Sequence, residues 1–260
     1  IFGSIGLLTV FLLNYRYPFF TQSSEGWSVG YSKSKDFNFS VPIDKNKIIH
    51  SYDVIGEDYE SGFIADPFFI DKNDTTYIFV ENQVKGSNAN ISLFTLFESG
   101  LEYKGTVIDE DFHMSYPQVF KYKEEYYMLP ETKRSNNVIL YKAKNFPYEW
   151  VQFDTLISNV RYKDPTLLLS EKGNYIFTCD DDMNLIVYES DNLFGVWSKK
   201  ENIPNLKGNK VRGGGRIFEY NNTYYYPVQN SKYGYGSGVS LLKITFDENV
   251  PIGAMIEVPS

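Results

Sequence analysis

The chain has 260 residues, 42% of them hydrophobic and 22% charged, which is typical of a folded globular protein rather than a disordered one. Its net charge of −8, with no basic stripe, argues against a nucleic-acid partner. One cysteine, Cys179, and two histidines leave no internal disulfide, no Cys-based zinc site and no His-rich metal site, and the sequence calls for no cofactor. Tyr and Phe supply most of the 17% aromatic share, and both favour β-strands.

An apolar stretch occupies residues 1–13. As a helix it would be about 20 Å long, too short for a bilayer, which needs about 20 residues. Three interpretations stay open: the remainder of a signal or anchor segment, a linker helix after an upstream domain, or a docked terminal helix. We therefore divide the chain into residues 1–26, a linker or truncated upstream segment, and residues 27–260, the folded domain.

An internal repeat organises the rest of the chain. Successive copies begin 50, 48 and 50 residues apart, at Asp66, Tyr116, Asp164 and Gly214. Each copy has two apolar residues at offsets 3 and 4 and a tyrosine at offset 11. Offset 15 is occupied by Glu81, Glu131, Cys179 and Gln229. Such regular spacing without internal gaps indicates one structural unit repeated around an axis.

Each copy has the pattern of a β-hairpin followed by further strands. In the first copy a short apolar run leads through a polar turn, residues 71–75, to an aromatic strand, and strands at 91–97 and 101–108 follow. Four antiparallel strands in about 50 residues make a propeller blade. We expect an all-β fold with five four-stranded blades, the fifth being closed between residues 27–61 and the C-terminal strand, which removes exposed edges. A four-bladed ring with an N-terminal extension is the alternative.

In a propeller the first strand of each blade lies nearest the axis, so equivalent residues form a ring around it. We therefore expect Asp66, Tyr116 and Asp164 at one mouth of the ring. The hairpins should bring Glu81 and Glu131 back to the same mouth. Crowded carboxylates in a partly dry pocket have pKa values that are pushed apart, which suits acid–base chemistry, and sugar hydroxyls bind carboxylates. The alternative is structural, since Asp-Pro also opens turns.

The fourth copy differs from the others, with Arg212 and Arg216 flanking three glycines beside the predicted axis. Arginine suits carboxylate or phosphate recognition, but these two could equally neutralise the acidic ring. His113 and Gln229 fall near the same mouth, and we count both as candidate substrate-binding residues together with Tyr116. The acidic run 180–182 lacks the spacing of an EF-hand loop and fits a solvated turn better than a Ca²⁺ site.

Five short motifs carry a resemblance to a known family: ADPF (65–68), FHMSYP (112–117), LPE (129–131), DPT (164–166) and GRIF (215–218). In order and spacing they resemble the N-terminal domain of glucosamine inositolphosphorylceramide transferases and its bacterial relatives, over about residues 27–250. The resemblance places the chain among the five-bladed propellers shared by arabinanases, β-xylosidases and invertases. It also implies a neighbouring catalytic domain: a glycosyltransferase domain in plants, a formyltransferase-like domain in bacteria.

The wider glycosidase superfamily implies roles for single residues. Asp66 matches the first-blade aspartate that acts as general base or nucleophile, and Asp164 resembles the aspartate that tunes the pKa of the acid. The general acid of arabinanases is a glutamate on a later blade, where this sequence has Gly214 and Arg216. Glu131 or Glu81 would then have to act as the acid. The carboxyl separation would decide between retention, at about 5–5.5 Å, and inversion, at about 6.5–9.5 Å.

Two functions follow from these observations. The chain is a carbohydrate-active enzyme that hydrolyses or transfers a glycosyl unit, with Arg212 and Arg216 holding an anionic substituent, or it is a glycan-binding accessory domain beside a separate transferase domain. The expected partner is a carbohydrate or glycoconjugate, and membrane association would come only through an upstream segment. Of the possible locations, a cytoplasmic or membrane-associated bacterial protein is favoured.

Overall fold

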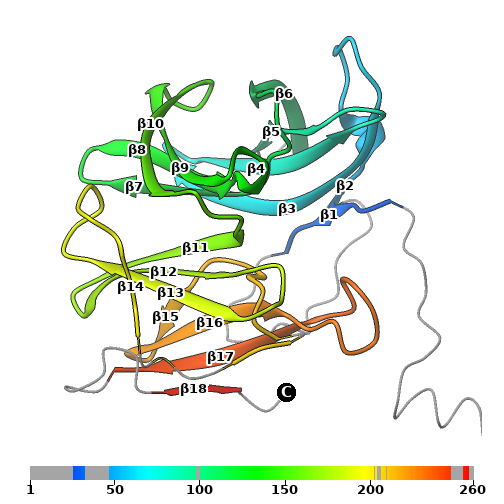
Figure 1. Cartoon of the computed structure of the whole chain (residues 1–260). Coiled ribbons are helices and arrows are strands. Elements are labelled where there is room, and N and C mark those ends of the chain that lie inside the picture. The colour runs from blue at the N-terminus through cyan, green and yellow to red at the C-terminus, as the bar shows by residue number, and fades with distance from the viewer. Residues whose placement is uncertain are drawn as a thin grey trace, which may run out of the picture.

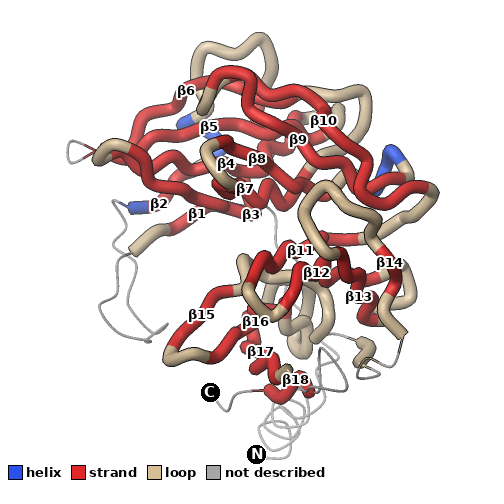
Figure 2. The backbone as a smooth tube through the Cα atoms, turned by 90° about the vertical axis from the view of Figure 1, so that its left-hand side faces the viewer, coloured by secondary structure: helices blue, strands red, loops and turns tan. Residues whose placement is uncertain are grey.

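The structure is a computed structural model that describes residues 26–32, 47–97, 100–201, 203, 206–208, 210–246 and, as backbone, 254–257. The apolar stretch 1–13 lies outside the described residues, so its three interpretations are not resolved. Within the described part of the chain, helices occur only as short 3₁₀ turns, such as η2 (Ser51–Asp53) and η3 (Lys133–Ser135), while strands dominate (Figure 2). None of these described helices is long and apolar enough to cross a membrane.

Among the residues that the structure describes, four four-stranded antiparallel sheets surround a central axis, as the repeat predicts (Figure 1). The first blade contains β3 (Ser61–Lys72), β4 (Thr75–Val84), β5 (Ala89–Phe97) and β6 (Gly100–Ile108). The second contains β7 (Ser115–Tyr122), β8 (Glu125–Glu131), β9 (Asn137–Asn145) and β10 (Glu149–Ser158). The third contains β11 (Lys163–Ser170), β12 (Gly173–Cys179), β13 (Leu185–Ser190) and β14 (Ser198–Lys199). The fourth contains β15 (Phe218–Tyr220), β16 (Thr223–Gln229), β17 (Val239–Thr245) and β18 (Ala254–Glu257).

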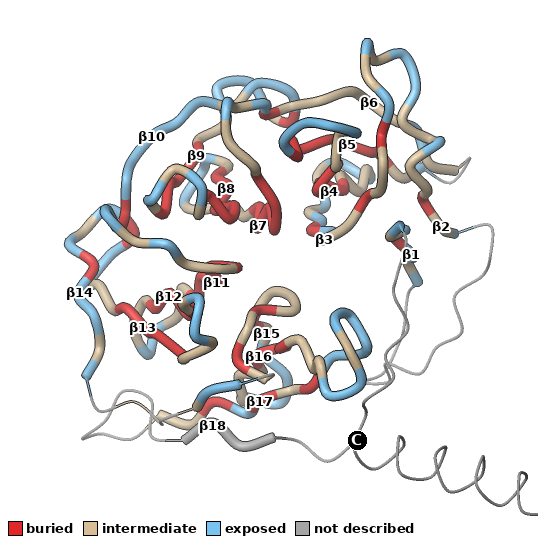
Figure 3. Tube along the Cα trace, turned by 45° about the vertical axis from the view of Figure 1, so that its right-hand side comes forward, coloured by how far each residue is buried: buried red, intermediate tan, exposed pale blue. Residues whose placement is uncertain are grey.

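The expectation of five blades is wrong, and the four-bladed alternative holds. The N-terminal region supplies only a two-stranded sheet of two-residue strands, β1 (Val29–Gly30) and β2 (Ile48–Ile49), among its described residues. The C-terminal strand β18 pairs with β17 and completes the fourth blade, so it does not join the N-terminal strands. The small sheet β1–β2 lies on the side of the ring between the first and fourth blades (Figure 3).

The hydrophobic core lies in the seams between neighbouring blades. Between the first and second blades, Phe79 and Leu93 pack with Met128 and Tyr141, all of them at most 1% exposed. Similar clusters fill the seams between the second and third blades and between the third and fourth. The sheet β1–β2 packs on the first blade through Val29. Because each blade buries its faces against its neighbours, the ring holds the inner strands β3, β7 and β11 in fixed positions around the axis.

Candidate functional site

The inner strands of the first three blades carry a β-bulge at the same place. In the first blade the register of β3 on β4 shifts between Ala65 and Phe68, which leaves Asp66 and Pro67 between the paired residues. The equivalent shifts in the second and third blades fall between Ser115 and Gln118 and between Lys163 and Thr166. A bulge redirects a side chain, and it tolerates a proline because that position needs no ladder N–H.

The residue at each bulge has a left-handed backbone. The φ angle is 48° at Asp66, 51° at Tyr116 and 46° at Asp164. Such a conformation costs about 1–3 kcal/mol for a residue other than glycine, so the surrounding blades must hold it in place. The fourth blade brings Gly213 to this level, where a Cβ atom would lie 2.7 Å from Tyr116 Oη. Gly213, which has no side chain, therefore leaves room at the axis for these residues of the other blades.

These inner strands surround a cavity of about 570 Å³ at one mouth of the ring. The structure brings most of the predicted site residues into its lining: Asp66, Glu81, His113, Tyr116, Glu131, Arg212 and Gln229. Asp164 is 0% exposed and lies behind the lining, where Arg212 contacts it. Arg216 is outside the lining.

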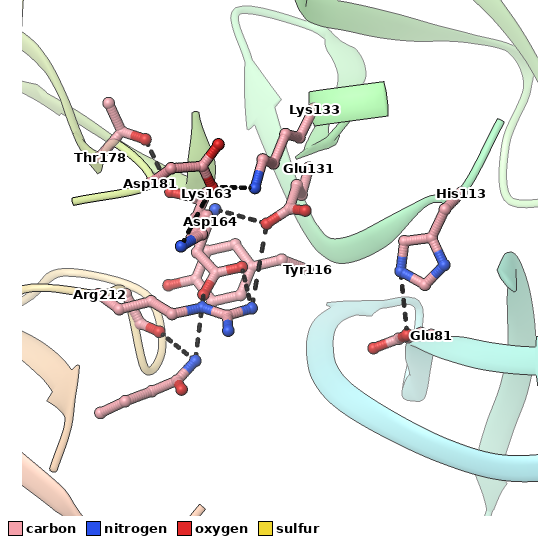
Figure 4. Close-up of polar contacts among 12 residues, drawn as sticks. Glu81, His113, Tyr116, Glu131, Lys133, Lys163, Asp164, Thr178, Asp181 and Arg212 are labelled. Atoms are coloured by element: carbon pink, nitrogen blue, oxygen red, sulfur yellow. Dashed lines mark hydrogen bonds and ion pairs between the residues drawn. The ribbon is translucent and has the colours of Figure 1, made fainter. Parts of the chain in front are cut away.

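Asp164 is the centre of a buried polar network (Figure 4). Arg212 donates to its carboxylate from Nε at 2.5 Å and from Nη2 at 3.2 Å, and Gln229 Nε2 donates to it at 3.1 Å. The backbone N–H of Asp164 donates in turn to Glu131 Oε2 at 3.0 Å, and Arg212 Nη2 lies 4.0 Å from the same oxygen. The guanidinium of Arg212 thus compensates the charge of Asp164 at the floor of the cavity.

Two carboxyl groups in the lining have raised pKa values. Burial raises the pKa of Glu131 well above its ordinary value, and the charge of Asp164 raises it further, while Arg212 opposes the shift. Burial raises the pKa of Asp66 well above its ordinary value too, followed by the charges of Asp164 and Glu81. Glu81 lies close enough to Asp66 for its charge to add to this shift, so the two carboxyl groups stand side by side in the cavity lining.

His113 extends the carboxyl pair toward solvent. Its Nδ1 accepts the backbone N–H of Ala89 at 3.4 Å, which assigns the ring proton to Nε2. Nε2 lies 3.4 Å from Glu81 Oε1 (Figure 4). His113, Glu81 and Asp66 therefore form a row of protonatable groups along one side of the cavity.

The remaining predicted residues lie deeper. Tyr116 is 2% exposed, and its hydroxyl bonds with Thr166 Oγ1 at 2.9 Å and donates to the Gly215 carbonyl at 3.0 Å. Arg216 crosses to the inner strands of two other blades, where Nη2 donates to the carbonyls of Phe69 at 3.1 Å and Val119 at 2.5 Å. These contacts place Tyr116 and Arg216 among the groups that hold blades together.

Cys179 occupies the register position that carboxylates occupy in the first two blades. It pairs with Lys163 as Glu81 pairs with Ala65. It is fully buried, and burial raises the pKa of its thiol to about 12. At this register position the third blade therefore has a protonated thiol in place of a carboxylate, and Asp164 is its carboxylate near the axis.

Two aromatic residues at the mouth were not anticipated from the sequence. Trp27 and Tyr235 line the cavity with their ring centroids 5.8 Å apart in an edge-to-face arrangement. The Tyr235 ring lies 5.5 Å from Arg212 Cζ, and its hydroxyl accepts from Nη1 at 3.4 Å. The glycine-rich loop 234–238 was the available signal for Tyr235, whereas Trp27 stood at the predicted domain boundary. Exposed aromatic faces at a polar cavity suit sugar rings.

No group of three or more His, Cys, Asp or Glu side chains could hold a metal ion in the part of the chain that the structure describes. In the acidic run 180–182, Asp180 accepts two hydrogen bonds from Asn184, both at 2.9 Å. Asp181 faces the lysines Lys133 and Lys163 (Figure 4). The carboxylates of Asp180 and Asp181 are therefore already bound by other groups of the chain.

Comparison with known proteins agrees with this geometry. The family model described as "Glucosamine inositolphosphorylceramide transferase 1, N-terminal" matches residues 10–252. A glucosamine inositolphosphorylceramide transferase 1 of Oryza sativa subsp. japonica is 33% identical over 217 residues, or 76% of this chain. That of Arabidopsis thaliana is 29% identical over 197 residues, or 71% of this chain. The matches span 29% and 26% of those relatives, so the chain covers less than a third of their length.

Solved structures share the propeller fold. An α-L-arabinofuranosidase of Podospora anserina, solved with cellotriose, has a TM-score of 0.58 at 15% identity, over 75% of this chain and 66% of that one. The RS223 β-xylosidase has a TM-score of 0.59 at 12% identity, over 81% and 78%. The expectation of a cytoplasmic or membrane-associated bacterial protein is wrong, because the named relatives are plant proteins.

Proposed function

We propose that this chain, which belongs to the N-terminal family of glucosamine inositolphosphorylceramide transferases, binds a carbohydrate or glycoconjugate in the axial cavity and hydrolyses or transfers a glycosyl unit there. One observation carries the proposal. Two carboxyl groups, Asp66 and Glu131, reach the same cavity from different blades, and burial raises the pKa of both, with the charge of Asp164 adding to each shift. Groups with a pKa near the working pH are the effective acids and bases of glycosyl chemistry.

The proposed roles follow from the surroundings of each carboxyl group. Glu131 is the acid, because its raised pKa keeps a proton available for the glycosidic oxygen. Asp66 is the base or nucleophile once it has lost its proton, and Glu81 is the carboxyl group beside it. Asp164 tunes both from behind the lining, held by Arg212. Trp27 and Tyr235 supply ring faces at the mouth for a sugar.

The test is a glycan screen by thermal shift, followed by turnover assays on every glycan that binds. We expect Asp66→Asn and Glu131→Gln to keep binding and to lower turnover by about 10²–10⁴-fold. The matched controls are Asp71→Asn and Glu125→Gln, which alter exposed carboxylates at the far ends of the same hairpin strands. Turnover that survives both cavity substitutions would refute the proposal.

A second candidate is a glycan-binding domain that presents its ligand to a separate transferase domain. Two observations favour it: the fourth blade places Gly213 where the other blades place strained side chains, and the chain spans 29% of the rice relative's length. Binding without turnover of any glycan would select this function. In that case Trp27→Ala and Tyr235→Ala should weaken binding, while Asp66→Asn should leave it nearly unchanged.

A further inference from the structure

A cluster of cations lies beside the cavity, on the seam between the second and third blades. Lys133 belongs to η3, two residues after Glu131, and Lys163 opens β11 directly before Asp164. Because the Asp164 N–H donates to Glu131, the two lysines flank the joint between these blades. Figure 4 shows them next to Glu131 and Asp164, on the side away from His113. The cluster therefore adjoins the carboxyl groups of the cavity.

Three cations of this cluster converge on one carboxylate. Lys133 Nζ contacts Asp181 Oδ1, Lys163 Nζ lies 3.3 Å from the same oxygen, and Arg161 Nε lies 3.9 Å from Oδ2. Asp180 also lies close enough to Lys163 to interact with its charge, but both of its oxygens accept from Asn184. Three positive charges thus face two carboxylates, in a chain whose net charge is −8.

Two of the three cations are held by the fold, whereas Arg161, whose side chain is 49% exposed, and the carboxylate are peripheral. The side chains of Lys133 and Lys163 are 16% and 19% exposed, and that of Asp181 is 56% exposed. Lys163 also pairs through its backbone with Cys179 in the ladder between β11 and β12. Two ordered ammonium groups beside a solvent-exposed anion have the geometry of an oxyanion site in which the anion can be exchanged.

The arginines of the fourth blade are already bound to groups of the chain itself. Arg212 makes two hydrogen bonds to Asp164, and Arg216 donates to the carbonyls of Phe69 and Val119. An anionic ligand would have to break a buried ion pair to use Arg212, which would leave the carboxylate of Asp164 buried without its cation. Displacing Asp181 costs less, because its carboxylate is 56% exposed and water can solvate it when it leaves the lysines.

We propose that Asp181 marks an oxyanion position, and that a phosphate group of the ligand takes its place on Lys133, Arg161 and Lys163. The placement of this phosphate next to a sugar in the cavity rests on the proposed function. Phosphate binding itself does not. The site would make the cavity selective for a phosphorylated sugar or a glycolipid whose headgroup carries phosphate, because three cations are arranged to neutralise an anion with several oxygens.

The experiment titrates inorganic phosphate into the wild-type chain by calorimetry, at constant ionic strength set with sodium chloride, since screening weakens exposed pairs. We expect saturable binding. Lys133→Gln and Lys163→Gln should each lower phosphate affinity about tenfold, the effect of one hydrogen bond to a charged group. Asp181→Asn removes the competing carboxylate and should raise the affinity. The control is Lys121→Gln, which removes an exposed lysine paired with Glu124 at the hairpin end of β7, the end opposite to Glu131, and should change nothing.

Further arms identify the source of the phosphate. Glucose 1-phosphate is compared with glucose, and phosphatidylcholine vesicles are compared with and without phosphatidylinositol. A preference for either phosphorylated ligand that Lys133→Gln abolishes supports the site and names its source. Absence of phosphate binding by both the wild type and Asp181→Asn would overturn it, and so would a loss in Lys121→Gln equal to that in Lys133→Gln. Asp66→Asn separates the two proposals, because it should abolish turnover and leave phosphate affinity unchanged.

Discussion

Arg212 donates two hydrogen bonds to Asp164, from Nε at 2.5 Å and from Nη2 at 3.2 Å, across the seam between the third and fourth blades. Asp164 is 0% exposed, so water does not solvate its charge. Arg212→Gln should therefore lower the free energy of unfolding by about 3–5 kcal/mol at neutral pH, because a buried carboxylate is left without its cation. Urea denaturation measures the change.

The double variant Arg212→Gln/Asp164→Asn is the control for this prediction. Removing both charges abolishes the unpaired carboxylate, so the double variant should be more stable than Arg212→Gln alone, with a coupling of about 0.5–3 kcal/mol in the cycle. Equal losses in the two variants would show that Arg212 acts through packing and not through Asp164.

The raised pKa values of Asp66 and Glu131 predict a stability that falls as pH rises. Between the ordinary carboxyl pKa and the raised one, the folded chain binds more protons than the unfolded chain, so the slope of stability against pH is negative in that window. We expect the midpoint of thermal unfolding to decrease as pH rises above the ordinary carboxyl range, from about pH 5 upward. Asp66→Asn and Glu131→Gln should each flatten the slope and raise the midpoint at neutral pH. Asp71→Asn, an exposed change on the same strand, should leave the slope intact.

Much of the site could be predicted because the repeat preserves register. Glu81 stands opposite Ala65 and Glu131 opposite Ser115, so equal offsets in the sequence become equal places in the blades. That is why Asp66, Glu81 and Glu131 converge on one cavity, as expected.

The features that were missed depend on long-range contacts. The number of blades depends on whether β18 pairs with β17 or with the N-terminal strands. The sequence of a strand does not by itself predict which strand it pairs with. Residues 27–61 are long enough for most of a blade, but their described strands are two residues each. Two contacts also join residues of different blades: the hydrogen bond from Arg212 to Asp164 and the ion pair of Lys133 with Asp181. The spacing of residues within one repeat therefore does not predict them.

Gly236 should be the least replaceable glycine at the mouth. Its φ is +72°, and a Cβ atom would lie 1.9 Å from Trp27 Cη2, so the indole packs on bare backbone. Gly236→Ala should displace Trp27 and weaken both stability and glycan binding. Gly86→Ala is a close control, since φ is +75° there and nothing lies within 4 Å of the added atom. Gly86→Ala should cost only the left-handed backbone term, about 1–2 kcal/mol. A Gly236→Ala variant no less stable than Gly86→Ala, with unchanged Trp27 fluorescence, would contradict the prediction.

We expect Arg216 to stabilise the ring of blades and not to bind the ligand. Its guanidinium ties the fourth blade to the carbonyls of Phe69 on β3 and Val119 on β7, and burial lowers its pKa. Arg216→Met keeps much of the length but removes the donors, leaving two carbonyls without their partner. We expect a loss of about 1–3 kcal/mol in unfolding free energy. Glycan and phosphate affinity should stay within error of the wild type, because Arg216 is absent from the cavity lining. A Met variant of normal stability that loses affinity for an anionic ligand would instead assign Arg216 to binding, the role that the sequence first indicated.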